Sequence, residues 1–304
     1  MVSRVMRFGG VHRRSFIGIL LMGLAMFILT AMDAAVKWII NDYSIQQVNL
    51  VRSIVAMIVL FPTIQAGGGF NLLQTKRPLI HLWRAILMVT ISYVWFFALG
   101  HMMLADLGAI VMIAPIIITA LSPFVLKEKV GWRRWVAVIT GFLGMIIVVR
   151  PGSGVFNPVA LMAICVAFGY ALLILSNRTN HAKESLVSLV YYPLIGIFFV
   201  SAFLSPVDWV QPDGLAWSIM IFIGVCAGGG HLCLTLASRY ASPPVLAPFE
   251  YTGLIWAILL GYFLFQELPT VFTFLGISLI LIAGIFIVYT ESQGKTDLKE
   301  SLPS

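Results

Sequence analysis

The chain has 304 residues, of which 60% are hydrophobic and only 10% are charged, and its mean hydropathy is +1.00. About a quarter of the residues of a soluble domain are charged, so this composition excludes a soluble protein. It indicates a chain whose apolar surface is covered by the lipids of a membrane. The net charge of +7 comes from short basic clusters between apolar runs, which excludes the continuous basic surface of a nucleic-acid-binding protein.

Ten apolar runs are long enough, at about 20 residues each, to cross the hydrocarbon core of a bilayer. Each must be a helix, because only a helix satisfies its backbone hydrogen bonds within one segment, and the runs lack the period-two alternation of a membrane barrel. The sequence therefore predicts an all-α integral membrane protein. The predicted spans are 16–40, 45–64, 79–100, 105–126, 132–149, 157–177, 184–204, 214–238, 243–266 and 270–290.

Basic residues alternate between the two sides of these spans. One side carries four arginines before the first span and the basic loops after the second, fourth, sixth and eighth spans, and Arg84 is counted with the first of these loops. Arg150 is the only basic residue on the other side. Because cytoplasmic loops are rich in Lys and Arg, both termini are predicted to be cytoplasmic, in the inner membrane of a bacterium.

The sequence also repeats itself. A shift of roughly 140 residues places Lys37 on Asn177 and Arg52 on Tyr192, and each half holds five spans. Since five is odd, the second half must enter the membrane from the opposite side. The predicted organisation is two inverted five-helix repeats around a central cavity. Its segments are a cytoplasmic N-terminal segment (1–15), a first repeat (16–150), a second repeat (157–290) and a cytoplasmic tail (291–304).

Several of these segments resemble a known family. The run from Ala105 through Pro115, the loop from Lys127 to Trp135 and the segment Gly141–Gly144 resemble the EamA-type repeat of the drug/metabolite transporter superfamily. The run from Ala247 through Pro269 resembles the matching second copy. The resemblance implies a ten-helix carrier of small metabolites such as amino acids, nucleosides, vitamins or amphipathic toxins. It also implies a cavity enclosed by the first four helices of each repeat, with the fifth helices at the periphery.

A first group of candidate site residues lies in the first two spans. A charge at the bilayer centre costs on the order of 3 kcal/mol or more, so ionisable residues inside spans are candidates by default. Asp33 and Lys37 lie one turn apart and are expected to form an i,i+4 ion pair, and Asn49 shares a helix face with Arg52. We expect this group to line the outer part of the cavity. The alternative is a neutralised structural network with Lys37 reaching outward to the interface.

A second group belongs to the other half of the chain. Glu250 in the ninth span and His231 in the eighth both lie toward the cytoplasmic side, and no basic residue in those spans neutralises Glu250. A carboxylate beside a histidine suits a proton-coupled or cation-recognising carrier. The structural alternatives are a Glu250 bonded to backbone groups freed by Pro248 and a His231 satisfied by an adjacent helix.

Two tyrosines complete the predicted site. Tyr93 in the third span and Tyr192 in the seventh are predicted to line the cavity, Tyr192 because its repeat partner is Arg52. For both residues, packing or contact with lipid is the alternative interpretation.

The predicted function is secondary active transport of a small polar metabolite by alternating access, with a coupled proton as one energy source. Mixed charges in the cavity favour a zwitterion or anion, such as an amino acid or carboxylate metabolite. A membrane-embedded enzyme and a passive channel are the alternatives, but no HExxH, G-x-S-x-G or Walker-type glycine loop is present. Three cysteines in apolar runs lack metal-type spacing, so no cofactor or metal is expected. A homodimer is left open.

Overall fold

The computed structural model describes residues 2–67, 69–125, 131–150, 157–180, 185–241 and 243–300, and every regular element in these ranges is a helix. Lys127 and Lys129, used above to orient the chain, lie outside them. The elements are α1 (Val2–Ile39), α2 (Ile45–Gly67), η1 (Gly69–Leu73), α3 (Pro78–His101), α4 (Leu104–Val111), α5 (Ala114–Val125), α6 (Trp132–Val149), α7 (Val159–Asn180), α8 (Leu186–Leu204), α9 (Gly214–Tyr240), α10 (Pro243–Glu250), α11 (Thr252–Phe265) and α12 (Val271–Glu300).

These helices make ten membrane crossings, as the sequence predicted. Within the described residues, eight helices are long and apolar enough to span a bilayer, and two shorter apolar helices, Trp135–Val149 and Val271–Ile287, supply the remaining two. Helix α1 begins well before the predicted residue 16, and α12 continues to Glu300 through most of the predicted tail. The all-helical, multi-pass fold is therefore confirmed, and the helices at the two ends are longer than predicted.

The fourth and ninth crossings are each made of two helices. The fourth breaks between α4 and α5, where Pro115 occupies the second position of α5. A proline fits there because the first turn of a helix has no internal partner for its N–H groups. The ninth breaks at Tyr251, three residues after Pro248, which cannot donate to the carbonyl four residues earlier. Broken helices in matching positions of two repeats are typical of transporter binding sites.

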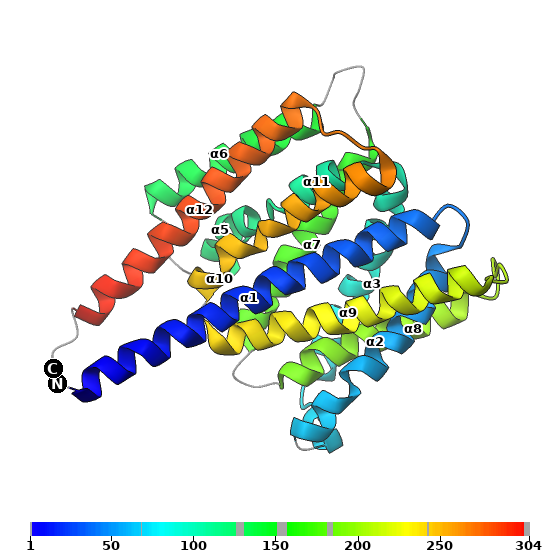
Figure 1. Ribbon diagram of the computed structural model, residues 1–304, viewed down its shortest axis with the longest axis horizontal. Helices are drawn as coiled ribbons and strands as arrows, with labels where there is room; N and C mark the ends of the chain where they lie inside the picture. The colour runs from blue at the N-terminus through cyan, green and yellow to red at the C-terminus, as the bar shows by residue number, and fades with distance from the viewer. Residues whose placement is uncertain are drawn as a thin grey trace.

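The packing of the helices has the symmetry of an inverted repeat. Helix α1 packs against α9, α10 and α11, and its counterpart α7 packs against α3, α4 and α5. Helix α2 packs against α9, and its counterpart α8 packs against α3. These contacts are exchanged with one another when the two repeats are exchanged. In Figure 1 the bundle of the first four crossings of each repeat forms the body of the molecule.

Helices α6 and α12, the fifth crossings of the two repeats, lie side by side at one edge of the bundle (Figure 1). They approach closely at two glycines. A Cβ added to Gly276 would lie 2.6 Å from the carbonyl oxygen of Gly144, and one added to Gly144 would lie 2.8 Å from that of Gly276. Small residues allow this kind of backbone contact between membrane helices. Gly144 of α6 therefore packs against Gly276 of α12 within the chain.

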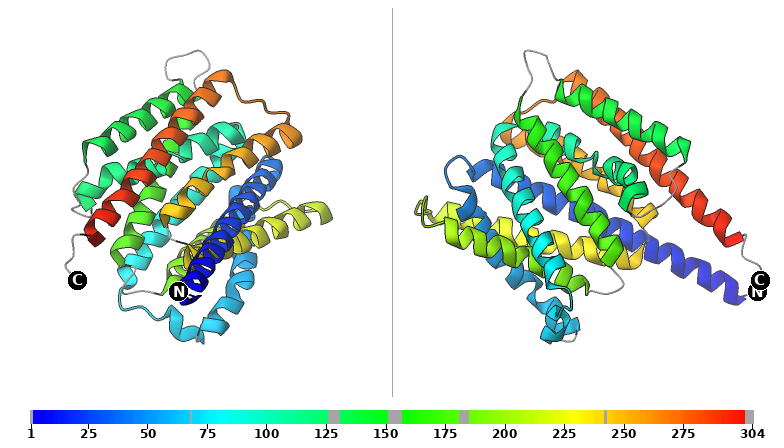
Figure 2. Two further views of the ribbon diagram at one scale, coloured as in Figure 1. Left: turned by 60° about the vertical axis from the view of Figure 1, so that its left-hand side comes forward. Right: turned by 180° about the vertical axis from the view of Figure 1, so that it is seen from behind.

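The N-terminal end of α1 and the C-terminal end of α12 lie at the same end of the bundle (Figure 2). This is the arrangement expected for an even number of crossings. The end of α9 lies at that end too, since Gly18 of α1 contacts Ala241. Large apolar side chains such as Leu20, Ile58, Phe203 and Phe263 are exposed on the outside of the bundle, where a bilayer would cover them.

Candidate functional site

A cavity of about 200 Å³ lies at the centre of the bundle, and we call it the central cavity. Its wall includes Asp33 from α1 and Glu250 from the end of α10, so each repeat contributes one carboxyl group. Trp95 and Tyr170 supply aromatic surface. The sequence predicted Asp33 and Glu250 in separate outer and inner groups. The structure brings them into one cavity because the broken ninth crossing places the end of α10 beside α1.

The carboxylate of Asp33 accepts a hydrogen bond from Trp95 Nε1 at 2.9 Å. The expected ion pair between Asp33 and Lys37 is wrong. Lys37 Nζ lies 2.6 Å from Glu267 Oε1 instead, and it also donates to the carbonyl of Met102. Because Glu267 of the other repeat lies within reach, the Lys37 side chain points toward the end of the helices. Asp33 is thus not paired with Lys37 and lines the cavity.

Glu250 is the last residue of α10, at the point where the ninth crossing breaks. Its side chain has no hydrogen-bond or ion-pair partner among the described residues, and the bond to backbone groups freed by Pro248, the alternative interpretation, is not found there. A carboxyl group in a membrane interior without a structural partner is expensive unless it faces a polar passage. The side chain of Glu250 can therefore form hydrogen bonds only with water or a ligand inside the cavity, or with residues outside the described ranges.

Arg52 is buried behind the cavity, with 5% of its surface exposed. Its Nη1 donates to Asn49 Oδ1 at 3.0 Å and to Ser92 Oγ at 2.9 Å, and Ser92 in turn donates to Asn49 at 2.8 Å. The guanidinium also lies 5.2 Å from the centre of the Phe96 ring. Arg52 and Asp33 attract each other electrostatically but are too far apart for an ion pair. Arg52 and Asn49 thus share a network, as their shared helix face indicated.

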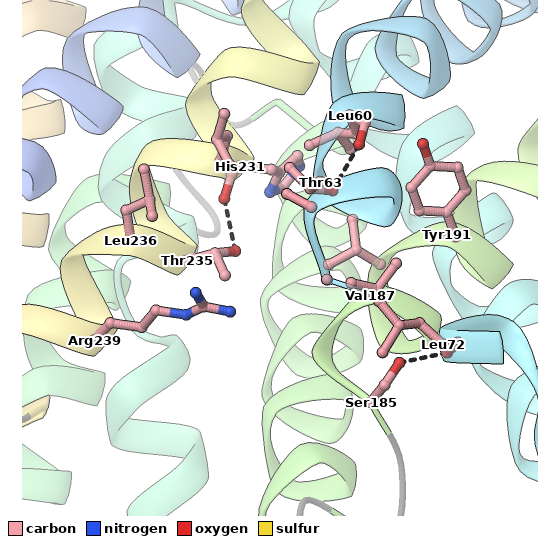
Figure 3. A pocket seen from close by; sticks show the side chains of 14 residues that line it. Leu60, Thr63, Leu72, Ser185, Val187, Tyr191, His231, Thr235, Leu236 and Arg239 are labelled. Atoms are coloured by element: carbon pink, nitrogen blue, oxygen red, sulfur yellow. Dashed lines mark hydrogen bonds between the residues drawn. The ribbon is translucent and has the colours of Figure 1, made fainter. Parts of the chain in front are cut away.

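Two further cavities lie on one side of the central one. The arginine cavity, of about 280 Å³, shares Tyr170 with the central cavity and is also lined by Arg84. The vestibule, of about 420 Å³, shares His231 and Thr235 with the arginine cavity and reaches the exposed Gly67 and Arg239. Figure 3 shows the Arg239 side chain extending from α9 into the vestibule. The three cavities are therefore neighbours, arranged from the end with the chain termini toward Asp33 and Glu250.

The opposite end of the bundle is sealed by contacts between the repeats. Glu267 accepts a hydrogen bond from the backbone N–H of Leu104 at 2.9 Å, in addition to its ion pair with Lys37. Gln47 of α2 exchanges two hydrogen bonds, of 2.7 and 3.1 Å, with the backbone of Val210. Asp106 lies in the first turn of α4, where its charge complements the helix dipole, and it also accepts a hydrogen bond from Thr273 of α12 at 2.8 Å. The structure is therefore open at one end and closed at the other.

The backbone explains why Glu267 reaches Lys37. Gln266, just after α11, has a left-handed conformation with φ of 56°, and the N–H of Glu267 donates to the carbonyl of Gly261. The N–H of Gln266 also donates to the carbonyl of Tyr262, which is the αL cap that ends a helix and turns the chain back across its last turn. The side chain of Glu267 is thereby held at the sealed end.

Tyr93 and Tyr192 lie at contacts between helices. The hydroxyl of Tyr93 shares a hydrogen bond of 2.9 Å with Ser201 of α8, and the hydroxyl of Tyr192 donates to the carbonyl of Leu73 at 2.7 Å. The ring of Tyr192 also packs on His81, with ring centres 4.3 Å apart. Neither tyrosine is among the residues that line the three cavities described above.

Three residues of this arrangement were missed or misread from the sequence. Arg84 was counted as a loop charge but is 4% exposed inside the bundle, Trp95 was not singled out, and Glu267 was treated as a loop acid. A signal for Arg84 was present, since it lies six residues inside an apolar span. Nothing in the sequence separates Trp95 from the other seven tryptophans.

An inverted-repeat bundle of ten helices, with charged residues facing a cavity between its halves, defines a membrane transporter. The model of the EamA-like transporter family matches residues 16–150 and 157–290. The chain therefore belongs to the EamA-like transporter family, and its class is that of a transporter rather than an enzyme.

Characterised bacterial relatives carry different substrates. The chain is 27% identical to an S-adenosylmethionine uptake transporter of Rickettsia prowazekii, over 92% of this chain and 96% of the relative. It is 30% identical to a riboflavin transporter of Vibrio cholerae, over 81% and 83%, and 25% identical to a pseudopaline exporter of Pseudomonas aeruginosa, over 90% and 96%. A solved crystal structure shares the fold, with a TM-score of 0.65 over 93% of this chain and 98% of that chain at 15% identity.

Proposed function

We propose that the protein is a secondary carrier that moves a small polar metabolite, such as an amino acid, across the inner membrane of a bacterium by alternating access. The observation that carries this proposal is that Asp33 and Glu250, from opposite repeats, line the same central cavity. A substrate held between them would bind both halves of the bundle. Rocking of one half against the other would then expose the substrate to each side in turn.

The series of cavities supports a carrier rather than a passive channel. A channel needs a continuous path, whereas neither Lys37 nor Glu267, the ion pair at the sealed end, lines any of the three cavities. With both termini in the cytoplasm, as the distribution of basic residues favours, this conformation is open to the cytoplasm.

Glu250 also suits a coupled proton. It has no partner among the described residues, so protonation would break no structural bond, and a cationic group of the substrate would compete with a proton for the same carboxyl. Competition of this kind is one way to link substrate movement to a proton gradient.

Transport in reconstituted vesicles tests the proposal. Purified protein is placed in liposomes, and uptake is measured with labelled S-adenosylmethionine, riboflavin and the twenty L-amino acids, with and without a proton gradient. We expect uptake of at least one compound, and a loss of at least tenfold in Asp33→Asn and Glu250→Gln while both variants remain folded. Asp42→Asn, which removes an exposed carboxylate, is the matched control. Full uptake by Glu250→Gln would remove this residue from the mechanism, and flux far above carrier rates would indicate a channel.

A further inference from the structure

Arg84 is a buried cation for which the described residues supply no counter-charge. It extends from α3 between α7 and α8, where Nη1 donates to the carbonyl of Leu173 at 3.3 Å and to Ser176 Oγ at 3.4 Å. Nη2 donates to the carbonyl of Leu189 at 3.1 Å, and Nε has no partner. Among the described residues, no carboxylate lies within ion-pair distance of this guanidinium.

These contacts leave the charge poorly compensated. Two of the three hydrogen bonds are longer than the usual 2.7–3.2 Å range, and neutral carbonyl groups offset only part of the cost of burying a charge in a membrane. Arg52 is at least attracted by the nearby charge of Asp33, whereas no carboxylate among the described residues acts on Arg84 in this way. Arg84 instead lines the arginine cavity, which has room for an anionic group to supply the missing charge.

The arginine cavity is adjacent to the central cavity, because Tyr170 and Ile174 belong to the walls of both. A ligand of metabolite size would reach from one cavity into the other where these two side chains move aside. The central cavity presents two carboxyl groups and the arginine cavity presents a guanidinium. His231 and Thr235 line the arginine cavity from α9, in the other repeat, and provide further polar groups.

We propose that Arg84 binds the carboxylate of the substrate, so that the carrier takes a zwitterion whose cationic group lies toward Asp33 and Glu250. This inference rests on the proposed function and narrows its substrate class to α-amino acids and compounds that contain them. A guanidinium is suited to this role because its planar fork can donate two parallel hydrogen bonds to one carboxylate. Arg84 would therefore determine specificity for the anionic end of the ligand.

Matched pairs of ligands test this role directly. Binding of the twenty L-amino acids and of their α-amides, which lack the negative charge, is measured on purified wild-type protein and on Arg84→Gln and Arg84→Lys. We expect at least one amino acid to bind wild type at least tenfold more tightly than its amide. Arg84→Gln should lose that preference while its affinity for the amide changes less than twofold, and Arg84→Lys should keep part of the preference. Arg133→Gln, which removes an exposed arginine at the start of α6, should bind as wild type does.

The outcomes separate this inference from the function on which it rests. If Arg84→Gln keeps the full preference for acid over amide, the role of Arg84 is overturned while a carrier that depends on Asp33 and Glu250 stands. If Asp33→Asn and Glu250→Gln leave binding unchanged, the proposed cavity fails instead. Should Arg84→Gln fail to fold, equal binding of an amino acid and its amide by wild type overturns the inference. Absence of any amino-acid binding by wild type also overturns it.

Discussion

Lys37 on α1 and Glu267 just after α11 form an ion pair of 2.6 Å that joins the first repeat to the second at the closed end of the bundle. Their side chains are only 12% and 18% exposed, so water weakens their attraction less than it would at a fully exposed surface. Both also bond to the backbone between α3 and α4, through Met102 and Leu104. This pair therefore stabilises the conformation in which that end is shut.

Breaking the pair should favour the alternative conformation. We expect Lys37→Gln to lower the free energy that favours the conformation with this end shut by about 1–2 kcal/mol. This corresponds to roughly a 5- to 30-fold change in the ratio of the shut conformation to the conformation with this end open. The measurement is the labelling rate of Ala257→Cys, in the wall of the central cavity, by an impermeant thiol reagent added at the closed end. The three native cysteines are replaced beforehand.

The control for this prediction is charge reversal. Lys37→Glu combined with Glu267→Lys restores an ion pair and should return labelling toward the wild-type rate, although the hydrogen bonds to Met102 and Leu104 are changed. Equal labelling of wild type and Lys37→Gln would show that the pair does not hold this end closed.

The fold could be predicted from the sequence almost completely, because lipid imposes a strong constraint. An apolar run of about 20 residues has to be a helix in a bilayer, so runs, loops and basic clusters determine the ten crossings. The site was harder to predict, because it depends on which helices meet. Sequence spacing suggested that Lys37 pairs with Asp33. In the structure Lys37 pairs with Glu267 instead, a residue 230 positions away from it in the chain.

Arg84 illustrates the same limit. Its position near the start of a span is what a topology signal looks like, since arginine near a span end normally reaches to the interface. Only the packing of α3 between α7 and α8 shows that its side chain points inward. The burial of Arg52 could be predicted from the sequence, because Arg52 lies deeper in its span and its side chain cannot reach the membrane–water interface.

The network around Arg52 should be a main source of stability for the first repeat. Arg52→Ala removes charged hydrogen bonds to Asn49 and Ser92, and each hydrogen bond to a charged group contributes about 1.5–3 kcal/mol. Ser92→Ala keeps the bond between Arg52 and Asn49 and removes one of the two charged bonds, so it should cost about 1.5–3 kcal/mol. Thermal unfolding in detergent should therefore give a midpoint for Ser92→Ala between those of wild type and Arg52→Ala. A midpoint of Arg52→Ala equal to that of wild type would contradict a structural role for the network.

The contact between α6 and α12 leads to a prediction about two glycines in different surroundings. The Cβ of Gly276→Ala would lie 2.6 Å from the carbonyl oxygen of Gly144 and 2.5 Å from a methyl group of Val148, so the helices must separate. We expect a cost of about 1–3 kcal/mol, seen as a lower unfolding midpoint.

Gly229→Ala is the matched control, because it adds the same methyl group within a membrane helix. A Cβ at Gly229 meets no atom within 4 Å, and alanine is preferred to glycine inside a helix by about 0.5–1 kcal/mol. The two variants should therefore shift the unfolding midpoint in opposite directions. If both shift it equally, helix propensity rather than close packing determines the effect, and α6 and α12 are held together by their apolar side chains alone.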